Sequence, residues 1–222
     1  YDGTQPLHRF LFTYFKQHKQ MGSSDRRWAT RYIYSFFRLG KALIKEDTIL
    51  RLAISDFLCN QTLSLVIETR LPQFKEQINL SVQEKIALIT DEYPSFKLSE
   101  VFIFNENLSK DIEKQDFYES FFIQPDLFLR VKPSYINQLI KTLKEAEIAV
   151  EEISKTTLAL PNGTKLEKIV PSQQYYQVQD LSSQKTGDFF EPQTWDYWWD
   201  CCAASGGKSL LLHDLEPSVQ LL

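Results

Sequence analysis

The chain has 222 residues, 43% of them hydrophobic, which is enough for one large domain or two smaller ones with buried cores. Its longest apolar runs are far shorter than the ~20 residues that cross a bilayer, and no basic-then-apolar leader opens it, so we expect a cytoplasmic protein. A net charge of −4 argues against a protein that coats nucleic acid through charge alone.

The first section of the chain, residues 1–123, is predicted to be a helical domain. Apolar residues recur at i, i+3, i+4 and i+7, which predicts helices after Pro6, over Asp25–Gly40 and over Thr48–Leu58. A capping box over Ser81–Glu84 predicts another helix directly after it.

Residues 124–174 are predicted to form a small α+β subdomain. Leu127–Val131 is an expected strand, and Ser134 is expected to cap the amphipathic helix that follows. Two more strands, Thr156–Leu160 and Leu166–Val170, are predicted on either side of a Pro-Asn-Gly turn. The resulting β-α-β-β order is that of half a ferredoxin-like or RNA-recognition fold, although the aromatic RNA-stacking signature is missing.

Residues 175–222 are predicted to begin a Rossmann-like α/β domain. A short apolar strand, Tyr197–Cys201, leads into a turn of small residues and then into a helical stretch, Leu210–Leu215. Strand, small-residue loop and helix form the first unit of a doubly wound nucleotide-binding sheet. We expect the chain to end before a second strand is laid beside the first.

Charge is distributed unevenly along the chain. Residues 1–50 hold nine Lys or Arg against four Asp or Glu, a net charge of +5, so the remainder carries −9. A basic end on an acidic protein is typical of a surface that faces phosphates, and we predict that Arg26, Arg27 and Arg31 contact RNA. An ordinary solvated helix surface explains the same pattern.

Cysteines and histidines indicate neither a disulfide framework nor a metal site. There are three cysteines, two of them adjacent at Cys201 and Cys202, and this odd count fits a reducing compartment. The three histidines are scattered and have no metal-ligand spacing with the cysteines, so we expect no metal.

The segment from Asp200 to Ser209 carries the strongest chemical signal. Its small residues let backbone N–H groups approach a ligand closely, and the following helix offers its positive N-terminus to a carboxylate or a phosphate. A P-loop would need glycine where Cys202 stands, in a conformation that cysteine tolerates poorly. The alternative is an S-adenosylmethionine (SAM) loop, in which Asp200 and the backbone after it surround the methionine part of the cofactor.

The same segment resembles the first cofactor motif of the Sun/Fmu family of RNA cytosine-C5 methyltransferases, which runs Asp, any residue, Cys-Ala-Ala-Pro-Gly-Gly-Lys-Thr. Seven of the ten positions are identical, while Ser205 replaces the usual proline and Ser209 the usual threonine. The resemblance implies that SAM is the cofactor. The residues that it implies for cofactor binding are Asp200, Cys202, Ala203, Ala204, Ser205, Gly206, Gly207 and Lys208.

Weaker resemblances to the family lie upstream in the same order. Val178-Gln179-Asp180 followed by Ser183-Gln184 resembles the element that precedes the cofactor strand. Leu129-Arg130-Val131 followed by Pro133 resembles a Leu-Arg-Val-Asn stretch. Residues 22–27, GSSDRR, resemble a Gly-Ser-Lys-Asp-Arg-Arg stretch in the helical region of some members, of the type that acts on bacterial ribosomal RNA.

The resemblance also implies a reaction, in which a cysteine thiolate adds to C6 of a flipped-out cytosine before the methyl group reaches C5. The family's Thr-Cys-Ser-like and Pro-Cys-Ser-Gly-like motifs do not occur in these 222 residues, so no catalytic residue is assigned. The acidic residue that would hold the SAM ribose is expected beyond Leu222. We therefore predict that the chain alone has no methyltransferase activity and little affinity for SAM.

Three functions remain open at this point. The chain is expected to be the RNA-binding part and the first part of the catalytic domain of a SAM-dependent RNA methyltransferase, with ribosomal RNA favoured over transfer RNA. A stand-alone RNA-binding or assembly module without catalysis is the second possibility. A P-loop NTPase fragment is the third.

Overall fold

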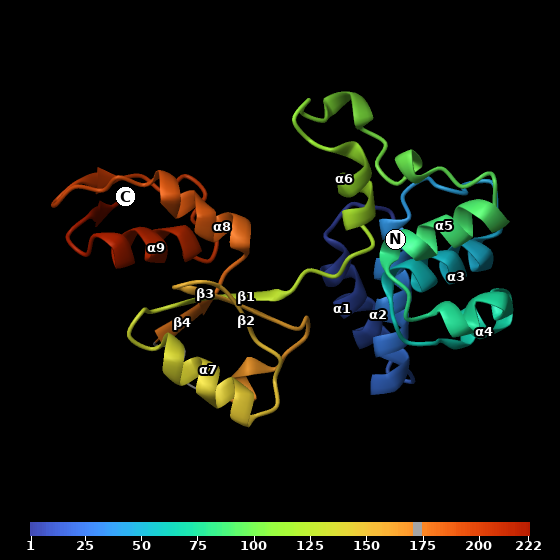
Figure 1. The fold of residues 1–222 in the computed structure, drawn as a ribbon, viewed down its shortest axis with the longest axis horizontal. Coiled ribbons are helices and arrows are strands. Elements are labelled where there is room, and N and C mark those ends of the chain that lie inside the picture. Colours follow the sequence, from blue (N-terminus) through green and yellow to red (C-terminus); the bar gives the residue numbers. More distant parts are fainter. Residues whose placement is uncertain (171–174) are drawn as a thin grey trace. The chain divides into compact units, whose positions relative to one another are not determined.

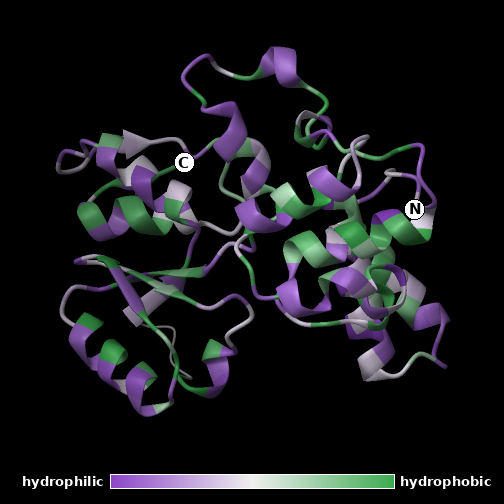
Figure 2. Cartoon of the chain, turned by 45° about the vertical axis from the view of Figure 1, so that its right-hand side comes forward, coloured by the Kyte–Doolittle hydropathy of each residue, from purple (hydrophilic) through white to green (hydrophobic). Residues whose placement is uncertain are grey.

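The computed structural model describes residues 1–170 and 175–222, which divide into two compact units, Tyr1–Gln124 and Pro125–Leu222 (Figure 1). In both units, hydrophobic residues lie along one side of most helices and hydrophilic residues along the other (Figure 2). Within the described ranges, no helix is both long enough and apolar enough to cross a membrane.

The first unit is helical, and the four helices predicted from the sequence are present. Its elements are α1 (Leu7–Gln17), α2 (Ser23–Arg38), α3 (Thr48–Cys59), α4 (Leu65–Arg70), α5 (Val82–Glu92) and α6 (Lys114–Ser120), with 3-10 turns η1 (Pro72–Gln77), η2 (Leu98–Glu100) and η3 (Asn105–Asn107). The predicted capping box begins α5, because the Ser81 N–H donates to Glu84 Oε2 at 2.9 Å and the Glu84 N–H donates to Ser81 Oγ at 3.3 Å.

Helix α3 forms the centre of this unit. It packs against α2, α4 and α5, and its residues from Ala53 to Cys59 are all buried. Phe57 and Ile54 are inaccessible to solvent and lie in a core that also includes Leu39, Ile67 and Ile89. Because the central helix is buried on most sides, its apolar residues extend beyond the narrow stripe of a surface helix.

The second unit begins with an antiparallel sheet. Its elements are β1 (Leu127–Val131), α7 (Ile136–Glu145), β2 (Glu151–Ser154), β3 (Thr157–Leu160), η4 (Leu166–Lys168) and β4 (Tyr176–Val178), and the strand order is β2-β3-β1-β4. Leu129 and Leu158, which oppose each other in the sheet, pack with Leu139 and Leu143 of α7 in one buried cluster. The sheet is thus covered by an amphipathic helix, in a mixed α/β architecture.

Two predictions for this sheet are wrong. Leu166–Val170 is not a strand, and the hairpin partner of β3 is the upstream strand β2. The apolar side chains of Leu166 and Val170 are buried in the core without strand pairing, while β1 and β2 occupy the two edges of β3. The N-cap of α7 is Tyr135, without a side-chain hydrogen bond, so Ser134 does not cap this helix.

The last part of the chain contains α8 (Leu181–Lys185), η6 (Thr186–Phe189), β5 (Tyr197–Trp198), α9 (Gly207–Leu215) and β6 (Gln220–Leu221). β5 and β6 pair in parallel, which corrects the expectation that the chain ends before a second strand lies beside the first. The connection from α9 to β6 is short enough for this because only residues 216–219 separate them. β4 pairs with β1, so residues 176–178, which the sequence assigned to the third section, extend the antiparallel sheet.

Candidate functional site

The loop between β5 and α9 is shaped by the carboxylate of Asp200. Its Oδ1 accepts the Cys202 N–H at 3.0 Å, and its Oδ2 accepts the hydroxyl of Ser209 in the first turn of α9. The Ser209 hydroxyl, the Cys202 N–H and the charge of Lys208 hold the pKa of Asp200 below its ordinary value. Asp200 is therefore a carboxylate that joins the start of the loop to its end.

Gly206 directs the chain from this loop into α9. It is the N-cap residue, and its φ of +80° lies in the left-handed region that glycine adopts without a steric penalty. The Leu210 N–H donates to Gly206 O at 2.8 Å, which begins the helical hydrogen bonding. The N–H groups of the first turn of a helix have no acceptor within the helix, so this end of α9 suits an anionic ligand.

The amide of Gln179 lies beneath the N-terminus of α9. Gln179 follows β4 directly and is only 6% exposed. Its Oε1 accepts from Arg130 Nε at 2.8 Å, whereas its Nε2 has no hydrogen-bond partner among the described residues. A Cβ on Gly207 would lie 3.4 Å from this Nε2, so the backbone at the start of α9 approaches the amide closely.

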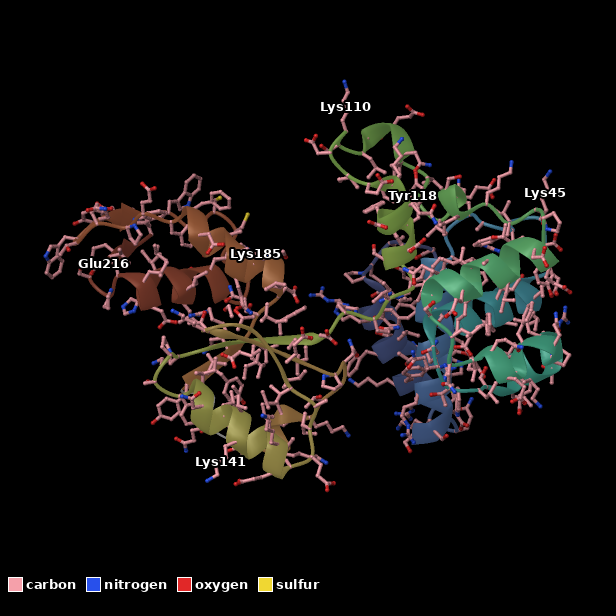
Figure 3. The ribbon with its side chains drawn as sticks, viewed as in Figure 1. Lys45, Lys110, Tyr118, Lys141, Lys185 and Glu216 are labelled. Atoms are coloured by element: carbon pink, nitrogen blue, oxygen red, sulfur yellow. The ribbon has the colours of Figure 1, made fainter. Side chains whose placement is uncertain are left out.

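Two further side chains hold Gln179 and Arg130 in place. Gln184 on α8 is buried, donates from Nε2 to the carbonyl oxygen of Gln179 at 2.7 Å, and accepts the Thr157 hydroxyl at 2.8 Å. Arg130 Nη1 donates to the carboxylate of Asp214 on α9. Arg130 belongs to one motif of the sequence and Gln179 and Gln184 to another, and in the folded unit the three residues form one network next to the Asp200–Ser209 loop. Figure 3 labels Lys185, at the end of α8, and Glu216, directly after α9.

A polar cavity of about 360 Å³ lies between this network and the loop. It is lined by Val178, Gln179, Asp180, Ser183, Cys202, Ala203, Ala204, Ser205, Gly207 and Lys208. Six of the eight predicted cofactor residues thus line one cavity. Asp200 and Gly206 are not among the lining residues, and they shape the loop instead.

A second cavity, of about 210 Å³, lies beside the same loop and is mainly apolar. It is lined by Phe190, Trp198, Trp199, Asp200, Cys201, Cys202, Lys208, Ser209, Leu212 and Leu221. Its aromatic rings and aliphatic side chains give it a chemical character different from that of the polar cavity, so the two cavities suit different parts of a ligand.

Arg130, Gln179 and Gln184 lie in segments that resemble family motifs, but they were not predicted as site residues. Nothing in the sequence pointed to Asp214. The position of Arg130, Gln179 and Gln184 in these motifs was the signal that could have identified them as site residues. Their contacts join residues that are far apart in the sequence, such as Arg130 and Gln179, and sequence spacing alone does not reveal such pairs.

The three arginines predicted to contact RNA lie in different environments. Arg31 donates to both carboxylate oxygens of the buried Asp56, at 2.6 and 3.0 Å, so its guanidinium is held within the helical unit. Arg26 Nε donates to the Met21 carbonyl at 2.9 Å, and the rest of its guanidinium makes no hydrogen bond to the described part of the chain. Arg27 is exposed, and no ion pair involves it among the described residues.

Helix α1 adds exposed cations and an exposed ring to this basic region. Arg9, Phe12 and Lys16 are spaced at i, i+3 and i+7, so they share one face of the helix, and all three are exposed. Lys16 Nζ lies 5.0 Å from the centre of the Phe12 ring. The sequence contains no acidic residue between Asp2 and Asp25, so this face has no acidic neighbours along the chain.

The cysteines fall into two environments. Cys59 is buried in the core of the helical unit, and burial raises the pKa of its thiol to about 12. Cys201 and Cys202 are exposed in the loop before α9. Over residues 1–170 and 175–222, no group of three or more His, Cys, Asp or Glu side chains is arranged to hold a metal ion.

No family model and no curated protein matches the chain. Among solved structures, the one titled "Crystal Structure of PH0851" is similar, with a TM-score of 0.46 and 18% sequence identity. The match covers 93% of this chain and 56% of that chain, so this chain spans little more than half the length of that structure.

Proposed function

We propose that this chain is part of a SAM-dependent RNA cytosine-C5 methyltransferase, in which the helical unit binds RNA and the second unit begins the cofactor-binding domain. The observation that carries the proposal is the polar cavity beside the Asp200–Ser209 loop. Three segments of the chain resemble the family, around Arg130, Gln179 and Asp200. They are separate in the sequence and lie together around this cavity and the start of α9.

The chemistry of the polar cavity fits the amino-acid end of SAM. The N-terminus of α9 and Lys208 suit a carboxylate, and the Gln179 amide, whose Nε2 has no partner within residues 1–170 and 175–222, adds a further hydrogen-bond donor. Asp180 is an acidic residue of the same lining and suits an ammonium group. When bound, SAM supplies an electrophilic methyl group, while these residues orient it.

The topology of the last segment is consistent with a Rossmann-like domain. β5, α9 and β6 form a parallel strand-helix-strand unit, with the small-residue loop directly after the first strand. In such sheets, ligands bind at the carboxyl ends of the strands, and this is where Asp200 and its loop lie.

A P-loop is supported less well than a SAM loop. The P-loop spacing requires its first glycine at the position of Cys202, whose φ is not positive. The positive φ values in the loop belong to Ala204 and Gly206. The Cys202 N–H donates to Asp200, so this N–H is not free to bind a phosphate.

The proposal is tested by protein-detected NMR titrations, which measure the weak binding that we expect from this chain. Millimolar S-adenosylhomocysteine should shift the backbone amide resonances of Cys202–Ser209 and the side-chain amide of Gln179. ATP is the matched competitor, because a P-loop binds it and a SAM loop does not. Shifts of Lys208 and Ser209 with ATP, without a response to S-adenosylhomocysteine, would contradict the proposal and support the P-loop.

A further inference from the structure

Arg130 is a buried arginine, 9% exposed, at the centre of the second unit. Its Nε donates to Gln179 Oε1 at 2.8 Å and its Nη1 donates to the Asp214 carboxylate. Its Nη2 is buried and has no acceptor among the described residues. Of the two described side chains to which Arg130 donates, Gln179 lines the polar cavity beside the Asp200–Ser209 loop and Asp214 does not.

The contact with Arg130 determines which end of the Gln179 amide faces Arg130. A guanidinium has only donors, so the amide must present its oxygen to Arg130. The NH2 group at the other end of the planar amide then faces away from Arg130. A Cβ on Gly207 would lie 3.4 Å from this Nε2, so the donor lies against the start of α9.

The backbone of Gln179 is held as firmly as its side chain. Its N–H donates to the carbonyl of Phe128 in β1 at 3.1 Å, and its carbonyl accepts from Gln184 Nε2 at 2.7 Å. Turning the amide over would place its NH2 against the donors of Arg130 and leave both sets of donors without an acceptor. The two backbone hydrogen bonds hold Gln179 between β1 and α8, and the bond from Arg130 determines which way its amide faces.

A buried donor without an acceptor is unfavourable unless water or a ligand supplies one. We propose that Arg130 is a positioning residue that fixes the NH2 group of Gln179 toward the N-terminus of α9, where it donates to the carboxylate of the bound ligand. This inference rests on the proposed function, since the ligand carboxylate is that of the amino-acid end of SAM. Arg130 itself acts only through Gln179.

Gln179→Glu is the first test because it keeps the size of the side chain and an oxygen for Arg130. It replaces the NH2 donor by a second carboxylate oxygen, which repels a ligand carboxylate. The affinity for S-adenosylhomocysteine, measured by NMR titration, should fall by about tenfold or more. The affinity for methioninol, which keeps the amine and thioether of the amino-acid end but has no carboxylate, should stay within about twofold, since the lost contact is not made to it.

Arg130→Met is the second test, with Lys132→Met as its matched control on the exposed residue two positions along the chain. Arg130→Met should weaken S-adenosylhomocysteine binding in the wild-type background and have no further effect in the Gln179→Glu background, because Arg130 acts through the amide. Lys132→Met should leave both affinities unchanged. If Arg130→Met does not fold, the Gln179→Glu comparison decides the question alone.

The results separate the inference from the proposed function. An unchanged affinity of Gln179→Glu for S-adenosylhomocysteine overturns the inference and leaves the SAM proposal standing. An equal loss of affinity of Gln179→Glu for both ligands also overturns the inference, because the network would then only support the fold. A wild-type chain that binds neither ligand at millimolar concentration overturns the proposed function, and the inference with it.

Discussion

At the scale of single residues, the surroundings lower the pKa of two side chains, with opposite effects on their charge. Asp200 is half-buried and accepts hydrogen bonds that stabilise its charge, so its pKa is lowered. Lys85 is 1% exposed, and burial disfavours its charge, which lowers its pKa to about 8. Lowering the pKa favours the charged form of the acid and the neutral form of the base.

Asp200 should remain ionised below the ordinary titration range of an aspartate. Because its pKa in the folded chain is lower than the 3.8 of the unfolded chain, its contribution to stability is present above 3.8 and is lost as pH falls through the folded value. In an NMR pH titration, the Cys202 amide resonance should move with a midpoint below 3.8. Asp200→Asn should remove this movement, and a midpoint at or above 3.8 would contradict the hydrogen-bonded loop.

Lys85 should make the helical unit more stable as pH rises above about 8. Its Nζ donates to the carbonyls of Phe57 and Asn60 at the end of α3, and a neutral amine can keep both hydrogen bonds. Between about 8 and 10.5 the unfolded chain holds a proton that the folded chain has lost, so the free energy of unfolding rises with pH. We expect a gain of about 1 kcal/mol over the first pH unit above the folded pKa.

Urea unfolding at a series of pH values measures this gain, and Lys85→Met should abolish it. Cys59 contributes with the opposite sign above its ordinary pKa of 9.0, because the folded chain keeps the thiol proton up to about 12. Cys59→Ala therefore serves as the background in which the rise due to Lys85 continues toward 10.5. A flat stability profile of the wild type between about pH 8 and 9 would refute the prediction.

At the scale of elements, the end of α2 depends on one glycine. Gly40 has a φ of +57°, and a Cβ there would lie 2.1 Å from the carbonyl oxygen of Val101. The neighbouring Lys41 N–H donates to Glu100 O at 2.9 Å, which holds the two backbone segments close together. This close approach joins the end of α2 to the turn η2, so side-chain volume at residue 40 affects both elements.

Gly40→Ala should lower the free energy of unfolding by more than the ~1–2 kcal/mol that a positive φ alone costs an L-residue. Gly163→Ala is the matched control, since Gly163 has a φ of +80° but no atom within 4 Å of the added Cβ. The control should show the backbone penalty alone in the same urea titration. Equal losses for the two variants would show that the contact with Val101 is unimportant.

At the scale of the whole molecule, charge is segregated along the chain. The first 50 residues carry +5 and the rest carry −9, so the acidic total conceals a basic region on α1 and α2. Several cations of this region are exposed and free of ion pairs among the described residues, including Arg9, Lys16 and Arg27. Arg31 differs from them, because its guanidinium is bound to Asp56.

Arg27→Glu and Lys16→Glu should each weaken binding to single-stranded RNA and reduce its dependence on salt. Each lost phosphate contact lowers the slope of log K against log salt by about 0.7. Filter binding at several salt concentrations measures the slope, and Lys141→Glu on the exposed face of α7 is the control. Arg31→Glu should destabilise the helical unit itself. An unchanged slope in both Arg27→Glu and Lys16→Glu would refute the proposed RNA-binding surface on α1 and α2.

The sequence by itself determined the features that depend on neighbouring residues. The spacing of apolar residues predicted α1, α2 and α3, the capping box predicted α5, and strand β1 was predicted with its bounds. The loop Asp200–Ser209 was also recognised from consecutive residues. These features follow from local hydrogen bonds, helical periodicity and backbone conformation, all of which act over a few positions.

Only the tertiary structure decided which distant residues meet. It paired β3 with β2 and not with Leu166–Val170, laid β6 beside β5, and bound Arg31 to Asp56. It also placed Arg130 against Gln179, a contact across 49 positions. Such partners are selected by burial and by the satisfaction of buried polar groups across the whole unit, and no local spacing in the sequence records them.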